Sequence, residues 1–191
     1  MTETDEKEAL HALTSGDLWD RLADPGAAPG GGSAAAVVAG MAAALTAKAA
    51  RRSSNSWSDA RGVAAQAGSL AKRCTELAQE DAHAFDAALQ ALENPTDVAL
   101  PLAQTVAVLL ELGETAADVA ELAARTAEHC DGTFRGDAVS ATLLAEAAAR
   151  VVTALVASNL TVAKGDERLL RARRLADVAA AAARRALDAG P

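Results

Sequence analysis

Aromatic side chains are almost missing from this sequence. Only 2% of its 191 residues are Phe, Trp or Tyr, and there is no tyrosine at all. Since 51% of the residues are nevertheless hydrophobic, the core has to be built from alanine, leucine and valine. Such small side chains let helices approach one another closely, so we expect long, tightly packed helices. The length suits one domain, residues 1–191, in which residues 1–14 are predicted to be frayed.

Cysteine is also scarce, and basic residues are outnumbered. Cys74 and Cys130 are the only two cysteines and form no CxxC pair, which is typical of a reduced, cytoplasmic protein. His11 and His129 have no ligand-like spacing to a cysteine or carboxylate, so no metal is expected. The formal net charge of −8 argues against nucleic acid as a partner.

The sequence has no clear membrane or export signal. Its first residues are acidic rather than apolar, so no leader is expected. The longest apolar run, which starts at Ala34, consists mostly of alanine and is interrupted by Lys48. We therefore predict no membrane span.

Alternation of apolar and polar residues, the pattern of half-buried strands, does not occur. The periodicity instead predicts an all-α fold of five long helices plus one short N-terminal helix that Ser15 caps. The long helices are expected at residues 34–52, 59–93, 97–128, 138–163 and 167–189.

The most unusual stretch is Pro29-Gly30-Gly31-Gly32-Ser33, directly before the first long helix. Ser33 is a favoured N-cap residue, and a glycine loop leaves the backbone N–H groups of a helix start accessible. One interpretation is a site for an anion or a developing negative charge. The other is a tight turn that lets two backbones pass closely, and the loop alone does not decide between them.

Asp81 is the strongest candidate for chemistry. It lies one helical turn from both Leu77 and Phe85, so it shares their predicted buried face. A carboxylate in that position either pairs with a cation, such as an arginine of a neighbouring helix, or has a raised pKa that suits acid–base work. His83 points away from this face and is interpreted as a surface residue.

Three further polar residues have both a structural and a functional interpretation. Asp137 either caps the fourth long helix or joins Arg135 in a charged lip over a pocket. Asn159 lies on an otherwise apolar helix, where a buried amide needs partners, either from another helix or from a ligand.

Taken in order, these motifs resemble the formimidoyltetrahydrofolate cyclodeaminase and methenyltetrahydrofolate cyclohydrolase family. The resemblance covers most of the chain from residue 17 onwards. It rests on Pro29–Ser33 before an alanine-rich helix, Asp81–Phe85, the Pro-containing helix start Val98–Ala103, Arg135–Asp137, and Asn159-Leu160 at the end of a long helix.

The resemblance implies an all-helical homodimer that binds a tetrahydrofolate derivative as substrate. A cyclodeaminase closes a formimino group onto the neighbouring folate nitrogen and expels ammonia, whereas a cyclohydrolase adds water to the methenyl bridge. Both reactions need proton transfer and no metal or redox cofactor. Asp81 would be the acid–base carboxylate. The residues implied to bind substrate are Gly30, Gly31, Gly32, Ser33, Arg135, Asp137 and Asn159.

The sequence also departs from the family pattern. A basic segment that family members carry before Pro101 is shortened here and has lost its cations, and Leu155 replaces a usual asparagine. These changes predict weak or absent turnover of ordinary folates. A divergent enzyme acting on a non-folate imine, amidine or iminium compound therefore stays open, as does a non-catalytic, ligand-binding helical dimer.

Overall fold

The computed structural model of the chain describes residues 9–25, 28–93, 99–160 and 165–190. Within these ranges it is all-helical, as predicted, and contains no strand. Its α-helices are α2 (Ser15–Ala23), α3 (Gly31–Arg52), α4 (Ala60–Glu93), α5 (Ala99–His129), α6 (Arg135–Asn159) and α7 (Glu167–Asp188). Two short 3₁₀ helices, η1 (Leu10–Ala12) and η2 (Gly132–Phe134), accompany them.

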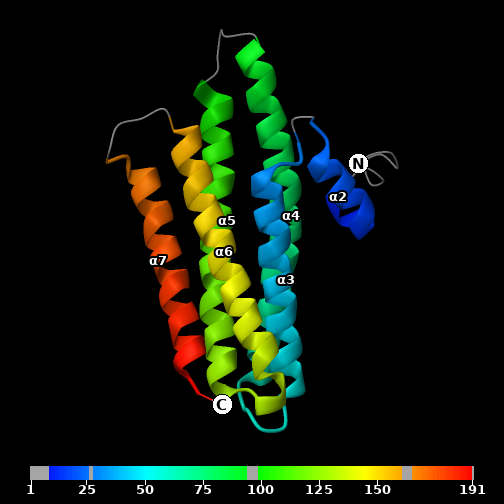
Figure 1. The fold of residues 1–191 in the computed structure, drawn as a ribbon, viewed down its shortest axis with the longest axis vertical. Helices are drawn as coiled ribbons and strands as arrows, with labels where there is room; N and C mark the ends of the chain where they lie inside the picture. Colours follow the sequence, from blue (N-terminus) through cyan, green and yellow to red (C-terminus); the bar gives the residue numbers. More distant parts are fainter. Residues whose placement is uncertain (1–8, 26–27, 94–98, 161–164, 191) are drawn as a thin grey trace.

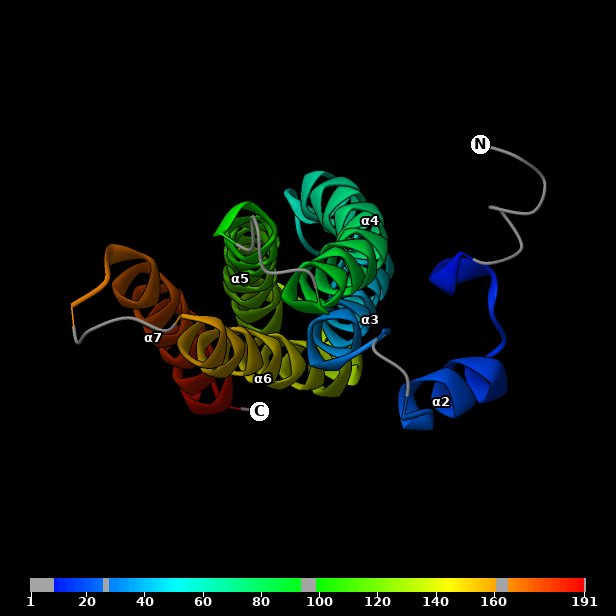
Figure 2. The same ribbon diagram turned by 90° about the horizontal axis from the view of Figure 1, so that it is seen from above.

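The five long helices run alternately up and down in one bundle (Figure 1). Helix α3 packs against α4, α5 and α6, and α7 covers α5 and α6. The short helix α2 lies outside the bundle on the side of α3, as the view from above shows (Figure 2). The predicted division into five long helices and one short one is therefore confirmed.

Alanine fills the centre of the bundle, as the composition predicted. Ala36, Ala39, Ala42 and Ala43 of α3 are completely buried. Small residues also bring α3 and α4 close together, since a Cβ atom built on Gly40 would lie 3.4 Å from the Cβ of Cys74 on α4. Side-chain size sets the distance between packed helices, so this composition produces the tight packing.

Three helix starts differ from the sequence-based predictions. Helix α3 begins at Gly31, with Gly30 as its N-cap, so two of the three glycines are helical and Ser33 is not the cap. Helix α2 is capped by Thr14, whose hydroxyl accepts a hydrogen bond from the N–H of Asp17, and not by Ser15.

The third difference concerns Asp137, which does not cap α6. Phe134 occupies the N-cap position without a side-chain hydrogen bond, and Asp137 lies in the first turn. Its carboxylate forms an ion pair with Lys48 of α3 instead. The predicted ends at residues 97 and 163 lie outside the described residues.

Two described segments, Gly31–Arg52 and Gly132–Asn159, are long and apolar enough to cross a membrane by length and composition alone. In the bundle, 56% of the apolar window of the first and 39% of that of the second are buried. A core helix of a bundle passes the same test, and α3 packs as one. The absence of a membrane span stays a prediction.

Candidate active site

Asp81 is buried in the middle of α4, with only 5% of its surface exposed. It lies against the first turn of α3, directly over Gly32. A Cβ atom built on Gly32 would come within 2.1 Å of the Asp81 Oδ1 atom and 2.4 Å of its Cγ atom. Only a residue without a side chain fits beneath this carboxyl group, which explains why glycine occupies this position.

Ser33 holds the same carboxyl group from the side. Its hydroxyl donates a hydrogen bond of 2.9 Å to the Asp81 Oδ2 atom, and its backbone N–H also bonds to the carboxyl group. Gly30, the N-cap of α3, has no side chain that could accept a hydrogen bond from the first turn. The carboxyl group of Asp81, on the neighbouring helix α4, accepts one of these N–H groups in its place. Asp81 thus takes up one N–H group of the glycine motif, and binding of substrate by Gly30, Gly31, Gly32 and Ser33 stays a prediction.

The environment of Asp81 raises its pKa. Burial raises the pKa of Asp81 above its ordinary value of 3.8, and the two hydrogen bonds from Ser33 oppose this rise. Among the described residues no salt bridge to Asp81 is present, so the alternative of an ion pair with an arginine is not realised there. Leu77 is fully buried and Phe85 half-buried on the same helix, which confirms the predicted face.

Asn159 lies at the same end of the bundle as the glycine motif. Leu155, one turn before it on α6, flanks Gly31, because a Cβ built on Gly31 would lie 3.5 Å from a Leu155 methyl group. The first turn of α3 is therefore bordered by a carboxyl group on the α4 side and by an apolar side chain on the α6 side. Asn159 itself is half-buried at the last residue of α6.

Arg135 and Asp137 lie at the opposite end. Asp137 Oδ2 is 2.7 Å from the Nζ atom of Lys48, and Arg135 donates a 2.8 Å hydrogen bond to the carbonyl oxygen of Ala186. Lys48 follows Gly32 by sixteen helical residues, a separation of about 24 Å along α3. Within one chain these two side chains do not join Asp81, and their role in binding substrate stays a prediction.

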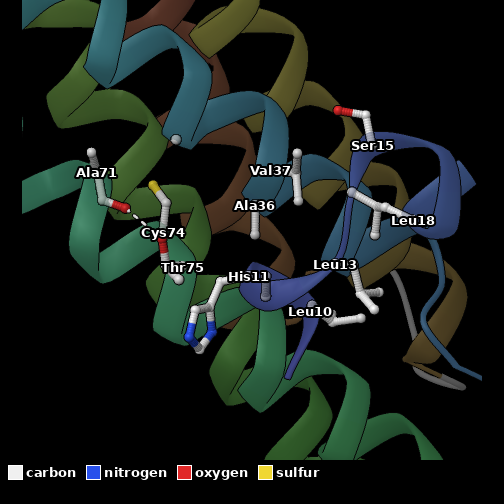
Figure 3. A pocket seen from close by; sticks show the side chains of 12 residues that line it. Leu10, His11, Leu13, Ser15, Leu18, Ala36, Val37, Ala71, Cys74 and Thr75 are labelled. Carbon is white, nitrogen blue, oxygen red and sulfur yellow. Dashed lines mark hydrogen bonds between the residues drawn. The ribbon is translucent and has the colours of Figure 1, made fainter. Parts of the chain in front are cut away.

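Two cavities lie between the N-terminal segment and the α3–α4 side of the bundle. The smaller, of about 300 Å³, has Leu10, Leu13 and Leu18 grouped near Ala36 and Val37, and His11, Ser15 and Thr75 also line it (Figure 3). The larger, of about 970 Å³, extends to Pro29 of the glycine motif. Its polar lining includes Arg21, Glu76, Gln79, Glu80, His83 and Asp86. Asp81 lines neither cavity, but the next residue, Ala82, lines the larger one.

Nothing in the described part of the chain brings together three or more His, Cys, Asp or Glu side chains that could hold a metal ion. The polar groups at this end of the bundle include the Asp81 carboxyl group, the Ser33 hydroxyl and the backbone N–H groups at the start of α3.

Comparison with known proteins decides the family. The sequence model of the formiminotransferase-cyclodeaminase family matches residues 14–178, which include the glycine motif, Asp81 and Asn159. The chain belongs to this family. None of the curated proteins compared with the chain matches it.

A solved structure shares the fold of this cyclodeaminase-family chain. The crystal structure of formiminotetrahydrofolate cyclodeaminase from Thermotoga maritima superposes with a TM-score of 0.86 at 19% sequence identity. The match covers 94% of this chain and 96% of the other. The all-helical architecture predicted from the resemblance is thereby confirmed.

Sequence reasoning missed Gln79, a residue of the large cavity. Its side-chain oxygen accepts a 3.0 Å hydrogen bond from the N–H of Leu10, and its nitrogen lies 2.8 Å from the Nε2 atom of His83. The spacing of Gln79 and His83, one turn apart on α4, was visible in the sequence. Its contact with Leu10 was not, because that residue is 69 positions away.

Proposed function

We propose that this member of the formiminotransferase-cyclodeaminase family acts on a C–N bond of a tetrahydrofolate one-carbon adduct, formimino- or methenyl-tetrahydrofolate. It would do so either as an ammonia-releasing cyclodeaminase or as a cyclohydrolase. The observation that carries the proposal is the buried carboxyl group of Asp81, which lies on Gly32 and accepts hydrogen bonds from Ser33. Asp81 lies against the glycine motif on which the family resemblance partly rests, and the next residue, Ala82, lines the larger cavity.

The environment of Asp81 suits a group that gains and loses one proton per turnover. Burial raises its pKa, so protonated and ionised forms coexist closer to neutral pH than for a solvated carboxyl. In the cyclodeaminase reaction the neighbouring folate nitrogen adds to the formimino carbon and gives up its proton, and the resulting tetrahedral carbon expels its amine. Asp81 would take up the proton of the adding nitrogen and then deliver it to the leaving amine, which departs as ammonia.

Ser33 complements the ionised form that remains after this proton is delivered. Its hydroxyl and its N–H both donate to the carboxylate, which limits the cost of the charge in a buried position. The positive end of the α3 dipole favours the same ionised state. Burial thus favours the protonated form of Asp81, while Ser33 and the start of α3 stabilise the ionised form, and one turnover of the proposed reaction uses both forms.

One observation favours a second candidate, a related reaction on a non-folate imine, amidine or iminium compound. Leu155 presents methyl groups beside Gly31, so this wall of the first turn of α3 offers no side-chain hydrogen bond to a bound molecule. An apolar wall at this place favours a less polar substrate. The reacting group and the role of Asp81 would be unchanged.

The decisive experiment supplies both folates to the purified protein and follows the methenyl absorbance together with ammonia release. The folate proposal predicts turnover that is lost in Asp81→Asn while the melting temperature is kept. Fast turnover by the wild type would remove the case for a divergent substrate. If the folates are bound but not converted, or not bound at all, the folate proposal is wrong and simple amidines are tested next.

A further inference from the structure

The N-terminal residues 9–24, called the strap below, lie along the outside of α3 and α4 (Figure 2). Four leucines anchor the strap: Leu10 and Leu18 are buried and Leu13 and Leu22 pack partly buried against the core, whereas Trp19 is 54% exposed. Cavities of about 300 and 970 Å³ both border Leu10 and His11. The strap therefore crosses a groove that it fills only in part.

A relay of two hydrogen bonds fastens the strap at Leu10. The N–H of Leu10 donates to Gln79 Oε1 over 3.0 Å, and Gln79 Nε2 lies 2.8 Å from His83 Nε2. A backbone N–H only donates, so the amide oxygen of Gln79 has to face Leu10. The NH₂ group then faces His83, and since it also only donates, His83 Nε2 must be the unprotonated acceptor.

A proton on His83 is incompatible with this arrangement. Both ring nitrogens of an imidazolium are donors, so Nε2 would face the NH₂ group of Gln79 as donor against donor. Rotating the amide to offer its oxygen to His83 would point the NH₂ group at the N–H of Leu10. From this geometry we propose that the strap is a pH-dependent flap, whose Leu10–Gln79–His83 latch is released when His83 takes up a proton.

The groups around His83 come from three elements. His11 of η1 and Arg21 of α2 line the same cavity, as do Glu76, Glu80 and Asp86 of α4. Glu76 and Glu80 are paired with Arg73. His11 is the other histidine among the residues that line this cavity.

Release of the latch would open the groove beside Pro29 and expose the face of α4 that precedes Asp81. Ligand access to this side of the bundle would then depend on pH, with the closed form favoured at higher pH. The inference does not require Asp81 to be catalytic, because strap opening is measured without any substrate.

Amide hydrogen exchange of the full-length chain between pH 6 and 8 tests the proposal, after correction for the intrinsic pH dependence of exchange. Loss of one hydrogen bond predicts that protection of the Leu10 amide and of η1 falls about three- to ten-fold from pH 8 to pH 6. The amides of α3 and α5 serve as the internal reference and should not change.

Three variants separate the latch from other causes. In His83→Ala the protection should no longer vary with pH, and in His11→Ala it should vary as in the wild type. Gln79→Glu should reverse the trend, because a carboxylate accepts from both the N–H of Leu10 and a protonated His83. An unprotected strap at pH 8, or a wild-type pH dependence that survives in His83→Ala, would overturn the proposal.

Discussion

At the scale of single residues, the site depends on glycine at position 32, where the Asp81 carboxyl group leaves no room for a side chain. Asp81 is buried without a cationic partner among the described residues, and Gly32 provides the space in which its carboxyl group lies. Gly31, although adjacent, is open: a Cβ there would make only an ordinary contact with Leu155. The two neighbouring glycines therefore have different functions, and substitution distinguishes them.

Gly32→Ala should displace either the Asp81 carboxyl group or the first turn of α3, because the added methyl group would overlap with it. We expect a loss of about 1–3 kcal/mol in the free energy of unfolding, the usual effect of overpacking. Urea denaturation followed by circular dichroism measures this change. Gly31→Ala is the matched control and should stay close to wild type. Equal effects of both substitutions would show that the carboxyl group does not require the space over Gly32.

Asp81→Asn tests the buried charge. The pKa of Asp81 is raised in the folded state, so between pH 3.8 and that raised value the folded protein keeps a proton that the unfolded chain has released. This group's contribution to stability therefore falls as pH rises through that window, and it stays low above it. Asp81→Asn removes the cost of burying an ionised carboxylate. The free energy of unfolding of the variant, compared with that of wild type, should therefore increase from acidic to neutral pH.

The melting temperatures of wild type and Asp81→Asn, compared at pH 4 and pH 7, measure this difference. We expect the variant to melt at least as high as wild type at pH 7, with about 2–4 °C for each kcal/mol gained. Asp86→Asn, on the same helix but only half-buried, is the control. If the variant had a much lower melting temperature than wild type at pH 7, the ionised carboxylate of Asp81 would stabilise the fold, and burial would not be disfavouring its ionisation.

At the scale of helices, glycines inside α4 and α5 show how packing overrides helix propensity. A Cβ on Gly113 of α5 would lie 3.1 Å from a methyl carbon of Val152 on α6 and 3.4 Å from Leu175 on α7. Gly62 of α4 is exposed and has no neighbour within 4 Å of such an atom. Gly113 thus lies where α5, α6 and α7 pack closely, whereas Gly62 has no packing reason to be glycine.

Gly62→Ala should stabilise the protein by about 0.5–1 kcal/mol, the ordinary gain in helix propensity. Gly113→Ala should gain nothing or lose about 1–2 kcal/mol, because Val152 is fully buried and its branched side chain cannot easily move. Thermal unfolding of the two variants side by side gives the answer. If Gly113→Ala were the more stable variant, the contact of α5 with α6 and α7 would be looser than described.

At the scale of the whole molecule, apolar side chains remain exposed on the neighbouring helices α3 and α6. Met41 is 46% exposed, and Leu143 and Val151 are each 40% exposed. Exposed apolar surface of this kind is a common feature of subunit interfaces. Leu100 of α5 and Val178 and Leu187 of α7 are exposed as well, so exposure alone does not select one face. For the homodimer implied by the family resemblance we propose α3 and α6, which pack against each other, in an arrangement with two-fold symmetry.

Val151→Glu should weaken this dimer by placing a charge in its interface, and light scattering at micromolar concentrations should then report a monomer. Val178→Glu, at a similarly exposed valine on α7, is the matched control and should leave the dimer intact. A wild-type protein that is monomeric throughout this range, or a dimer unaffected by Val151→Glu, would contradict the proposed interface.

The sequence by itself determined the helical fold, because a period of 3.6 residues and an abundance of alanine are local properties. It also placed Asp81 on a buried face, since Leu77 and Phe85 lie one turn away on the same helix. The family followed from short motifs whose order along the chain is preserved. The helical period and each single motif can be recognised within a few helical turns, and the order of the motifs is read along the chain without any knowledge of contacts.

Only the tertiary structure decided which of these residues meet. The contact of Asp81 with Gly32 and Ser33 spans almost fifty residues, and that of Gln79 with Leu10 spans 69. The direction in which α6 crosses α3 places Asp137 beside Lys48 and leaves Asn159 at the glycine end. Such pairings depend on how helices pack and on which side chain is small enough to let another approach, and no local pattern encodes them.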